Sequence, residues 1–330
     1  MKSFFKTYLL EMLLIWGALG GYYLFPFGEY VYSMENGLHF EENFSVEILF
    51  YLATFYSLIS IFIMIGKVNK GEESKFLYLL KNIGKIKGDS KAKNILLFFG
   101  VKLFFIPLMI PWTVEFAIYI YYMVVGNDVV YATWIEYFNN YLFLLLTYIL
   151  GFIALLYYSF GYLIESNALD SKVKSVEPTV FGWIVTLICY PLFLTFVTRI
   201  IPFYTDDMAF FKNQEITFIV RVCLLLVMSF KIWSIATLGA KCSNLTNRGI
   251  VTKGPYKWVR HPHYLAKLVV WWVTLIPALA LFDYWIIGTM IFWTVVYVLR
   301  ALTEENHLKS DKNYVAYCDQ VKWRFIPFVF

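Results

Sequence analysis

Long apolar runs recur through the whole chain of 330 residues and constrain its fold more than any other feature of the sequence. Most of them reach the roughly 20 residues that a helix needs to cross a bilayer of about 30 Å, and the alternation typical of a membrane-spanning β-barrel is absent. Because 60% of the residues are apolar and only 15% are charged, an ordinary soluble domain is excluded. The sequence therefore predicts an all-α, polytopic transmembrane bundle of about eight spans, at 8–27, 46–66, 95–125, 138–164, 179–201, 216–238, 264–282 and 284–300.

Charges between the runs predict the orientation of the chain. The segment 67–94 carries eight lysines against three acidic residues, whereas 28–45 carries four glutamates and neither lysine nor arginine. Because basic loops stay in the cytoplasm, 67–94 is expected inside, and both termini are then cytoplasmic. The same bias explains the net charge of +5 without a nucleic-acid partner. The four cysteines have no paired spacing, which indicates free thiols.

The amino-terminal half offers one intramembrane carboxylate of interest. Pro107, Pro111 and Glu115 follow one another at intervals of four within a single apolar run. We expect a kinked helix with Glu115 near the outer interface, and a functional carboxylate is the alternative. Residues 1–215 otherwise match nothing recognisable, and we assign them as amino-terminal helices of unknown role that could form the substrate side.

Polar residues concentrate in two later segments, 247–264 and 300–327. Both are expected on the cytoplasmic face, where the helical hairpin around Asp283 would hold them side by side. Together they offer two glycines that allow close backbone approach, several aromatic rings and both signs of charge. Such a mixture suits a small charged cofactor, and we assign residues 216–330 as the core that holds its site.

These segments carry three ordered motifs. They read G-x-V-T-x-G-P-Y-x-x-V-R-H-P-x-Y at 249–264, R-x-x-x-E-E-x-x-L at 300–308, and Y-x-x-Y-x-x-x-V-x-x-R-x-I-P at 314–327. In this order the chain resembles the isoprenylcysteine carboxyl methyltransferase family, and phospholipid N-methyltransferases are similar in the same places. Ala266 stands where the family motif usually has glycine.

The resemblance implies an integral membrane methyltransferase that uses S-adenosylmethionine on the cytoplasmic face. It also implies a lipidic or prenylated substrate that enters from the bilayer, with carboxyl O-methylation of an isoprenylcysteine-like group favoured. Arg300 and Glu304 lie four residues apart on one face of the helix end, and they are our candidates for the catalytic residues that orient the accepting group. A carboxylate acceptor needs no base, whereas an amine would need Glu304 or His261. The cofactor contacts implied are Val251, Gly254, Tyr256, His261, Pro262, Tyr264 and Glu305.

Other functions remain alternatives at this point. An NADPH-dependent sterol or steroid reductase shares the R-H-P-x-Y motif, but the glutamate pair at 304–305 favours the methyltransferase. A transporter would account for the helices and for Glu11 and Glu115, but not for three ordered motifs on one face. With only four histidines in the chain, and with a proline between His261 and His263, no metal site is expected. The sequence leaves the exact substrate and the oligomeric state open.

Overall fold

The structure is a computed structural model that describes residues 75–86, 88–126, 129–166, 168–205, 209–279 and 284–329, with single positions before residue 62. Apart from those single positions, the expected spans 8–27 and 46–66 and the segment 28–45 lie outside the described residues, as do Glu11 and Asp283. The chain divides into two compact units, Met1–Pro111 and Trp112–Phe330.

The first unit contains α4 (Lys75–Asn82), the short 3₁₀ helix η1 (Ile83–Lys85) and the beginning of α5 (Ser90–Val125). Leu79, Ala92 and Ile95 form its described apolar core. The Tyr78 hydroxyl donates to Asp89 Oδ2 at 2.8 Å, which joins α4 to the start of α5. Pro107 and Pro111 both lie inside α5.

The second unit is built from long helices and short connecting elements. The chain after α5 forms α6 (Trp134–Tyr137), η2 (Phe138–Leu142, a π-helical turn) and α7 (Phe143–Leu163). These three segments are continuous with one another. The remaining helices are α8 (Val180–Leu187), α9 (Phe193–Thr198), α10 (Gln214–Leu238), η3 (Gly239–Lys241), η4 (Gly254–Lys257), α11 (Pro262–Thr274), α12 (Ile276–Leu279), α13 (Tyr284–Leu308) and α14 (Lys312–Gln320). Two short strands, β1 (Ser175–Val176) and β2 (Thr246–Asn247), pair antiparallel.

The prediction of an all-α membrane bundle is confirmed at the level of helix content. Among the described residues, four helical segments are long and apolar enough to cross a membrane: Ser90–Val125, Trp134–Leu163, Gln214–Lys241 and Tyr284–Leu308. They overlap the expected spans at 95–125, 138–164, 216–238 and 284–300. The total of eight spans and the cytoplasmic position of both termini stay predictions.

Two of the expected spans are interrupted helices. The expected span 179–201 contains α8 and α9, and 264–282 contains α11 and α12. Proline explains both breaks, because it lacks the N–H that would continue the helical ladder and its ring clashes with the preceding turn. Pro191 lies between α8 and α9, next to Leu192 with a φ of 84°, and Pro277 lies at the start of α12.

Local sequence signals explain where the main helices begin and end. The Asn213 side chain accepts hydrogen bonds from the N–H groups of Glu215 and Ile216 at 2.8 and 3.0 Å, which caps α10. This helix ends at Gly239, whose φ is 56°. Pro262 starts α11 at the position where a helix tolerates proline best.

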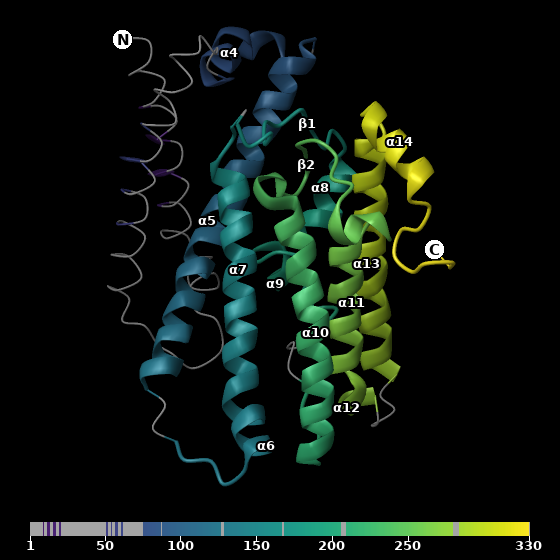
Figure 1. Cartoon of the computed structure of the whole chain (residues 1–330). Helices are drawn as coiled ribbons and strands as arrows, with labels where there is room; N and C mark the ends of the chain where they lie inside the picture. Colours follow the sequence, from purple (N-terminus) through teal and green to yellow (C-terminus); the bar gives the residue numbers. More distant parts are fainter. Residues whose placement is uncertain are drawn as a thin grey trace. The chain divides into compact units, whose positions relative to one another are not determined.

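Within the second unit, α10 packs between α7 and α11, and α13 packs against α8 and α11 (Figure 1). Trp271, Met290, Trp293 and Tyr297 belong to the apolar core between α11 and α13. The carboxyl ends of α7, α10 and α13 and the amino end of α11 meet at the same end of the bundle, together with β1, β2 and α14 (Figure 1). We call this the polar end.

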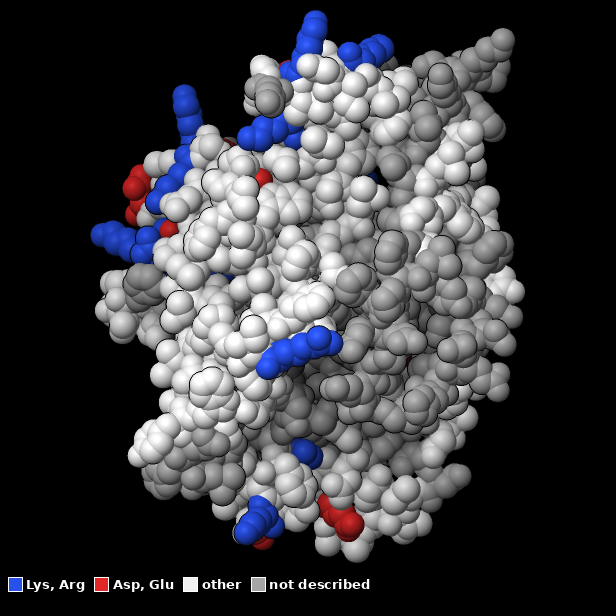
Figure 2. All heavy atoms as spheres, turned by 180° about the vertical axis from the view of Figure 1, so that it is seen from behind, with Lys and Arg blue, Asp and Glu red and all other residues white. Residues whose placement is uncertain are grey.

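Figure 2 shows one face of the molecule. Wide areas of the described surface on this face, drawn white, carry no charged side chain. A broad uncharged surface is what a chain in contact with lipid presents.

Candidate functional site

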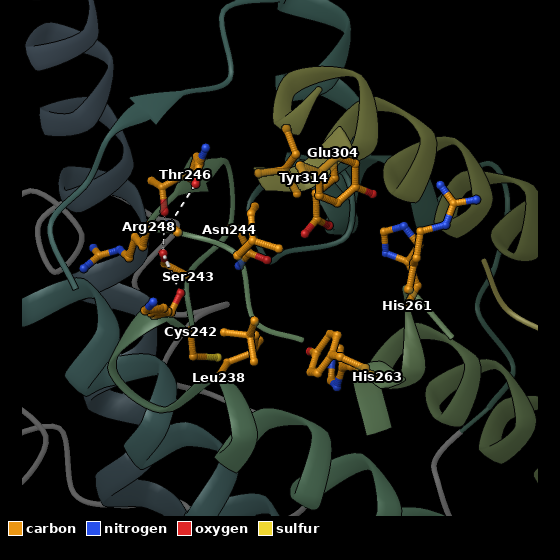
Figure 3. A pocket seen from close by; sticks show the side chains of 18 of the residues that line it. Leu238, Cys242, Ser243, Asn244, Thr246, Arg248, His261, His263, Glu304 and Tyr314 are labelled. Carbon is orange, nitrogen blue, oxygen red and sulfur yellow. Dashed lines mark hydrogen bonds between the residues drawn. The ribbon is translucent and has the colours of Figure 1, made fainter. Parts of the chain in front are cut away.

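A pocket opens at the polar end, between the loop that follows α10, the beginning of α11 and the ends of α13 and α14. It encloses about 910 Å³, including the open space at its mouth. Figure 3 shows Glu304 and Tyr314 on one side of this pocket, Leu238, Cys242 and His263 on the opposite side, and Asn244 between them. Val251, Tyr256, His261, Tyr264 and Glu304, all expected at the site, line it.

A second, smaller chamber adjoins the pocket, with an empty volume of about 350 Å³ that includes open solvent. It adds Arg300, Thr303 and His307 from α13 with Glu177 and Thr186 from the segment around α8. We call the larger space the main pocket and the smaller one the side chamber. The residues that line both are Ser243, Asn244, Thr246, Tyr264, Glu304 and Leu308.

The loop after α10 is fixed by buried polar contacts. The Asn244 N–H donates to the Tyr162 hydroxyl at 2.9 Å, and Asn244 Nδ2 donates to the Tyr190 hydroxyl at 2.8 Å. Arg248 donates to the carbonyl oxygen of Ser171 at 2.9 Å, which joins the loop to the segment before β1. Asn244 is therefore held from two directions where it separates the two chambers.

Arg300 is buried, with 4% of its surface exposed. It donates to the Tyr190 hydroxyl at 3.3 Å and also to Asn244 Oδ1. The rings of Tyr190, Tyr264 and Tyr297 lie 5.2–5.5 Å from its guanidinium carbon, within cation–π range. None of the ion pairs among the described residues includes Arg300. A buried cation without an acidic protein partner is rare in proteins.

Glu304 lies one helical turn after Arg300 and lines both chambers. The Tyr264 hydroxyl donates to Glu304 Oε2 at 2.8 Å, so the carboxylate is anchored to α11. Its exposed position within the site leaves the other oxygen open to a ligand.

Glu305 does not line either chamber. Its carboxylate is 1% exposed and binds Arg260 Nη1 at 3.0 Å, His261 Nε2 at 3.2 Å and Arg324 Nε at 3.1 Å. Backbone hydrogen bonds from Arg260 to Trp323 and from His261 to Arg324, both 2.9 Å, join the same segments. Glu305 thus ties the first motif and the carboxy-terminal segment to α13, and nothing in this geometry places it against a cofactor.

Two other expected cofactor contacts also lie outside the lining. Pro262 starts α11, and Gly254 starts η4 with a φ of 55°. A Cβ on Gly254 would come within 2.7 Å of Thr237 Oγ1, so glycine allows the motif to approach α10 closely. Both residues shape the loop that carries Val251 and Tyr256.

The buried polar atoms on the pocket lining that have no hydrogen-bond partner within the described part of the chain include the Tyr314 hydroxyl and His263 Nδ1. His263 Nε2 lies 3.2 Å from the Tyr158 hydroxyl. Burial raises the pKa of Tyr314, so its hydroxyl stays protonated and can donate. Burial also raises the pKa of Cys242 to about 12, which keeps this thiol neutral and unsuited to act as a nucleophile.

Several site residues carry no signal in the sequence. Tyr158 and Tyr190 lie inside apolar runs where tyrosine is common, and Glu177 lies in a segment without a motif. Asn244 belongs to the polar run directly after α10. Its position at the end of a helix is the sequence feature that could have indicated a site residue. Among the described residues, no group of three or more His, Cys, Asp or Glu side chains is placed to hold a metal ion.

Taken together, these features define a helical membrane protein with a polar, two-chamber site at one end of its bundle. The model of the isoprenylcysteine carboxyl methyltransferase family matches residues 218–310, which confirms the resemblance over α10, α11 and α13. The matched region thus contains Arg300, Glu304 and most of the main pocket. Comparisons with curated proteins and with solved structures give no match.

Proposed function

We propose that the chain is an integral membrane methyltransferase that uses S-adenosylmethionine and methylates a carboxylate on a lipidic or prenylated substrate. The observation that supports a carboxylate as the methyl acceptor is the environment of Arg300, a buried cation with no acidic partner among the described residues. An anionic group of a ligand would supply the missing countercharge. The matched family favours the carboxylate of an isoprenylcysteine-like group as the acceptor.

The main pocket fits the proposed cofactor in its chemistry. Glu304 offers a negative charge to the positive parts of S-adenosylmethionine, and the Tyr314 hydroxyl offers a hydrogen bond that no described residue of the chain uses. Tyr256 and His261 offer rings for the adenosine part.

When bound, S-adenosylmethionine supplies a methyl group on a positively charged sulfur. The task of the chain is to hold the acceptor, because positioning two reacting atoms about 3–3.5 Å apart can supply most of the acceleration of such a displacement. The guanidinium of Arg300 can donate a charge-assisted hydrogen bond to a carboxylate from Nη1, because Nη2 already donates to Asn244 and Tyr190. Asn244 and Tyr190 fix the position of that guanidinium.

Glu304 acts at the boundary of the two chambers. Tyr264 holds its carboxylate, and its negative charge faces the main pocket as well as the side chamber. A carboxylate acceptor is already an anion, so no general base is required. His261, the other expected base, lines the main pocket and binds Glu305 through Nε2.

The nature of the methylated product tests this proposal. Purified protein in lipid nanodiscs is incubated with methyl-labelled S-adenosylmethionine and an S-alkylated N-acetylcysteine that carries a long apolar chain. We expect label in the lipid fraction that alkali releases as methanol, because methyl esters hydrolyse and N-methyl groups do not. Alkali-stable label, or no transfer, would contradict the proposal.

A further inference from the structure

An exposed aromatic cluster lies beside the loop that lines the main pocket, and the proposed methyl transfer does not use it. The cluster consists of Phe230 and Trp233 of α10 and of Trp258, which directly follows η4. The ring centroids of the two tryptophans lie 5.6 Å apart, and that of Phe230 lies 6.1 Å from Trp233 and 6.5 Å from Trp258. The tryptophans nevertheless remain 47% and 54% exposed. Large apolar side chains that gather at a surface indicate a contact with another molecule.

The height of the aromatic cluster in the bundle indicates what it contacts. Helix α10 is long and apolar enough to cross a membrane, and Trp233 lies five residues before its end at Leu238. That spacing corresponds to about 7.5 Å along a helix, so the rings lie close to the boundary between the apolar helices and the polar end. Tryptophan is enriched at this level, because its ring is apolar and its N–H can donate to lipid head groups. Neither indole N–H of the cluster donates to a described residue.

The chain around the aromatic cluster is strongly basic. Residues 216–282, from α10 to α12, carry eight lysines and arginines and neither aspartate nor glutamate. Lys253 and Lys257 stand at the two ends of η4, close to Trp258 in the chain, and both are exposed. Neither lysine forms an ion pair or a side-chain hydrogen bond with a described residue. Two exposed ammonium groups beside exposed tryptophans suit a partner that is anionic and partly apolar.

We propose that the aromatic cluster, together with Lys253 and Lys257, binds the head groups of anionic phospholipids in the leaflet at the polar end. The lysines and the indole N–H groups donate to lipid phosphates, and the rings contact the glycerol and upper acyl region. Each lysine near an anionic membrane surface contributes about fivefold to such binding. A soluble anion offers no apolar part to cover the rings, so a lipid is the partner that fits both features.

This surface belongs to the same loop as the cofactor pocket. Tyr256, within η4, lines the main pocket, and its carbonyl oxygen accepts the Tyr317 hydroxyl at 2.7 Å. The Trp258 N–H donates to the carbonyl oxygen of Pro255 at 3.1 Å, so Tyr256 and Trp258 belong to one tight turn. Lipid contacts that hold Trp258 therefore also restrain Tyr256 and reduce the ordering that cofactor binding requires. Anionic lipid should then strengthen cofactor binding, a consequence that rests on the proposed function.

The test compares the whole chain in nanodiscs of phosphatidylcholine alone with the same protein in an equal mixture of phosphatidylcholine and phosphatidylglycerol. Native mass spectrometry of protein released from the mixture measures which lipid stays bound, and calorimetry measures the Kd of S-adenosylhomocysteine. We expect phosphatidylglycerol to be retained in preference, and the Kd to be about 3- to 10-fold lower in the mixture. Glycerol 3-phosphate added to phosphatidylcholine nanodiscs should leave the Kd unchanged.

Two double variants assign the lipid effect to this surface. Lys253→Gln combined with Lys257→Gln should abolish the preferential retention and bring the two Kd values to within about twofold of each other. The control, Lys309→Gln combined with Lys312→Gln, removes the same charge from two exposed lysines near the junction of α13 and α14 that line neither chamber. This control should keep the wild-type response, because the effect belongs to the aromatic cluster and its lysines and not to the net charge of the polar end.

The possible outcomes separate the lipid surface from its link to the cofactor and from the proposed function. Equal retention of the two lipids by the wild-type protein overturns the lipid surface, and so does an equal loss of preference in the control variant. Tighter cofactor binding with glycerol 3-phosphate assigns a soluble anion and overturns it as well.

Preferential retention at an unchanged Kd overturns the link between the lipid surface and the cofactor loop. If S-adenosylhomocysteine binds in neither kind of nanodisc, the proposed function fails, and lipid retention alone then decides the inference. The wild-type comparison does not depend on whether the variants fold.

Discussion

At the scale of single residues, Arg300 is the cation whose environment most resembles a ligand site. We predict that Arg300→Lys leaves membrane insertion intact, because the positive charge stays at the polar end. Methyl transfer should fall at least about 100-fold, since lysine lacks the planar fork and a displacement of about 1 Å has effects of this size. Labelled methyl transfer, normalised to inserted protein, measures this.

The matched control for that variant is Arg199→Lys, at the exposed residue just after α9 that lines neither chamber. It should keep normal turnover. Near-normal turnover in Arg300→Lys would instead assign Arg300 to the anchoring of a helix end.

Two neighbouring tyrosines provide a second matched pair. The Tyr314 hydroxyl lacks a partner in the described part of the protein, whereas the Tyr317 hydroxyl donates to the Tyr256 carbonyl oxygen at 2.7 Å. We predict that Tyr314→Phe weakens S-adenosylhomocysteine binding about 3- to 10-fold at unchanged stability, since one ligand hydrogen bond is lost. Tyr317→Phe should lower stability by about 1 kcal/mol. Calorimetry and thermal unfolding check the pair, and unchanged affinity in Tyr314→Phe would remove this residue from the site.

The sequence predicted the site residues whose side chains are polar and belong to motifs. Arg300 and His261 each line one of the two chambers, and Glu304 and Tyr264 line both. Their neighbour Glu305 lines neither, because successive residues on a helix point in different directions. Its side chain turns to Arg260 and Arg324, a contact that no spacing within the third motif reveals.

At the scale of elements, Glu305 is the main polar link between α13 and the carboxy-terminal segment. We predict that Glu305→Ala destabilises the protein by about 3–5 kcal/mol, because two arginines lose a buried partner. Thermal unfolding in mild detergent measures the loss. Glu304→Ala, one position earlier, should unfold close to the wild-type temperature while losing activity. Equal stability of Glu305→Ala and the wild type would contradict the role of Glu305 as a link.

The interrupted spans show why element boundaries could be predicted only in part. Apolar composition indicated a span at 179–201, but Pro191 divides it into α8 and α9. This break places the Tyr190 hydroxyl beside Arg300 and Asn244. By contrast, α13 is longer than the predicted span at 284–300. It continues to Leu308, because polar residues can extend a helix past the membrane. Arg300 and Glu304 therefore stand on a rigid element.

At the scale of the whole molecule, the orientation of the bundle decides where the cofactor site lies. We predict that the polar end and residues 67–94 face the cytoplasm, because basic segments are retained there. Single cysteines at Lys85 and Lys212, introduced into a cysteine-free chain, test this with a maleimide that does not cross membranes. In intact cells, Lys212→Cys should react and Lys85→Cys should not. The reverse pattern would place the site outside.

The central claim is that the main pocket binds S-adenosylmethionine and not NADPH, and ligand-dependent thermal stability tests it most directly. A ligand that binds only the native state raises stability by about 2.7 kcal/mol at a concentration of one hundred times its Kd. The account predicts a rise in the Tm of the purified protein with S-adenosylhomocysteine and no rise with NADPH. Stabilisation by NADPH, with none by S-adenosylhomocysteine, would contradict it.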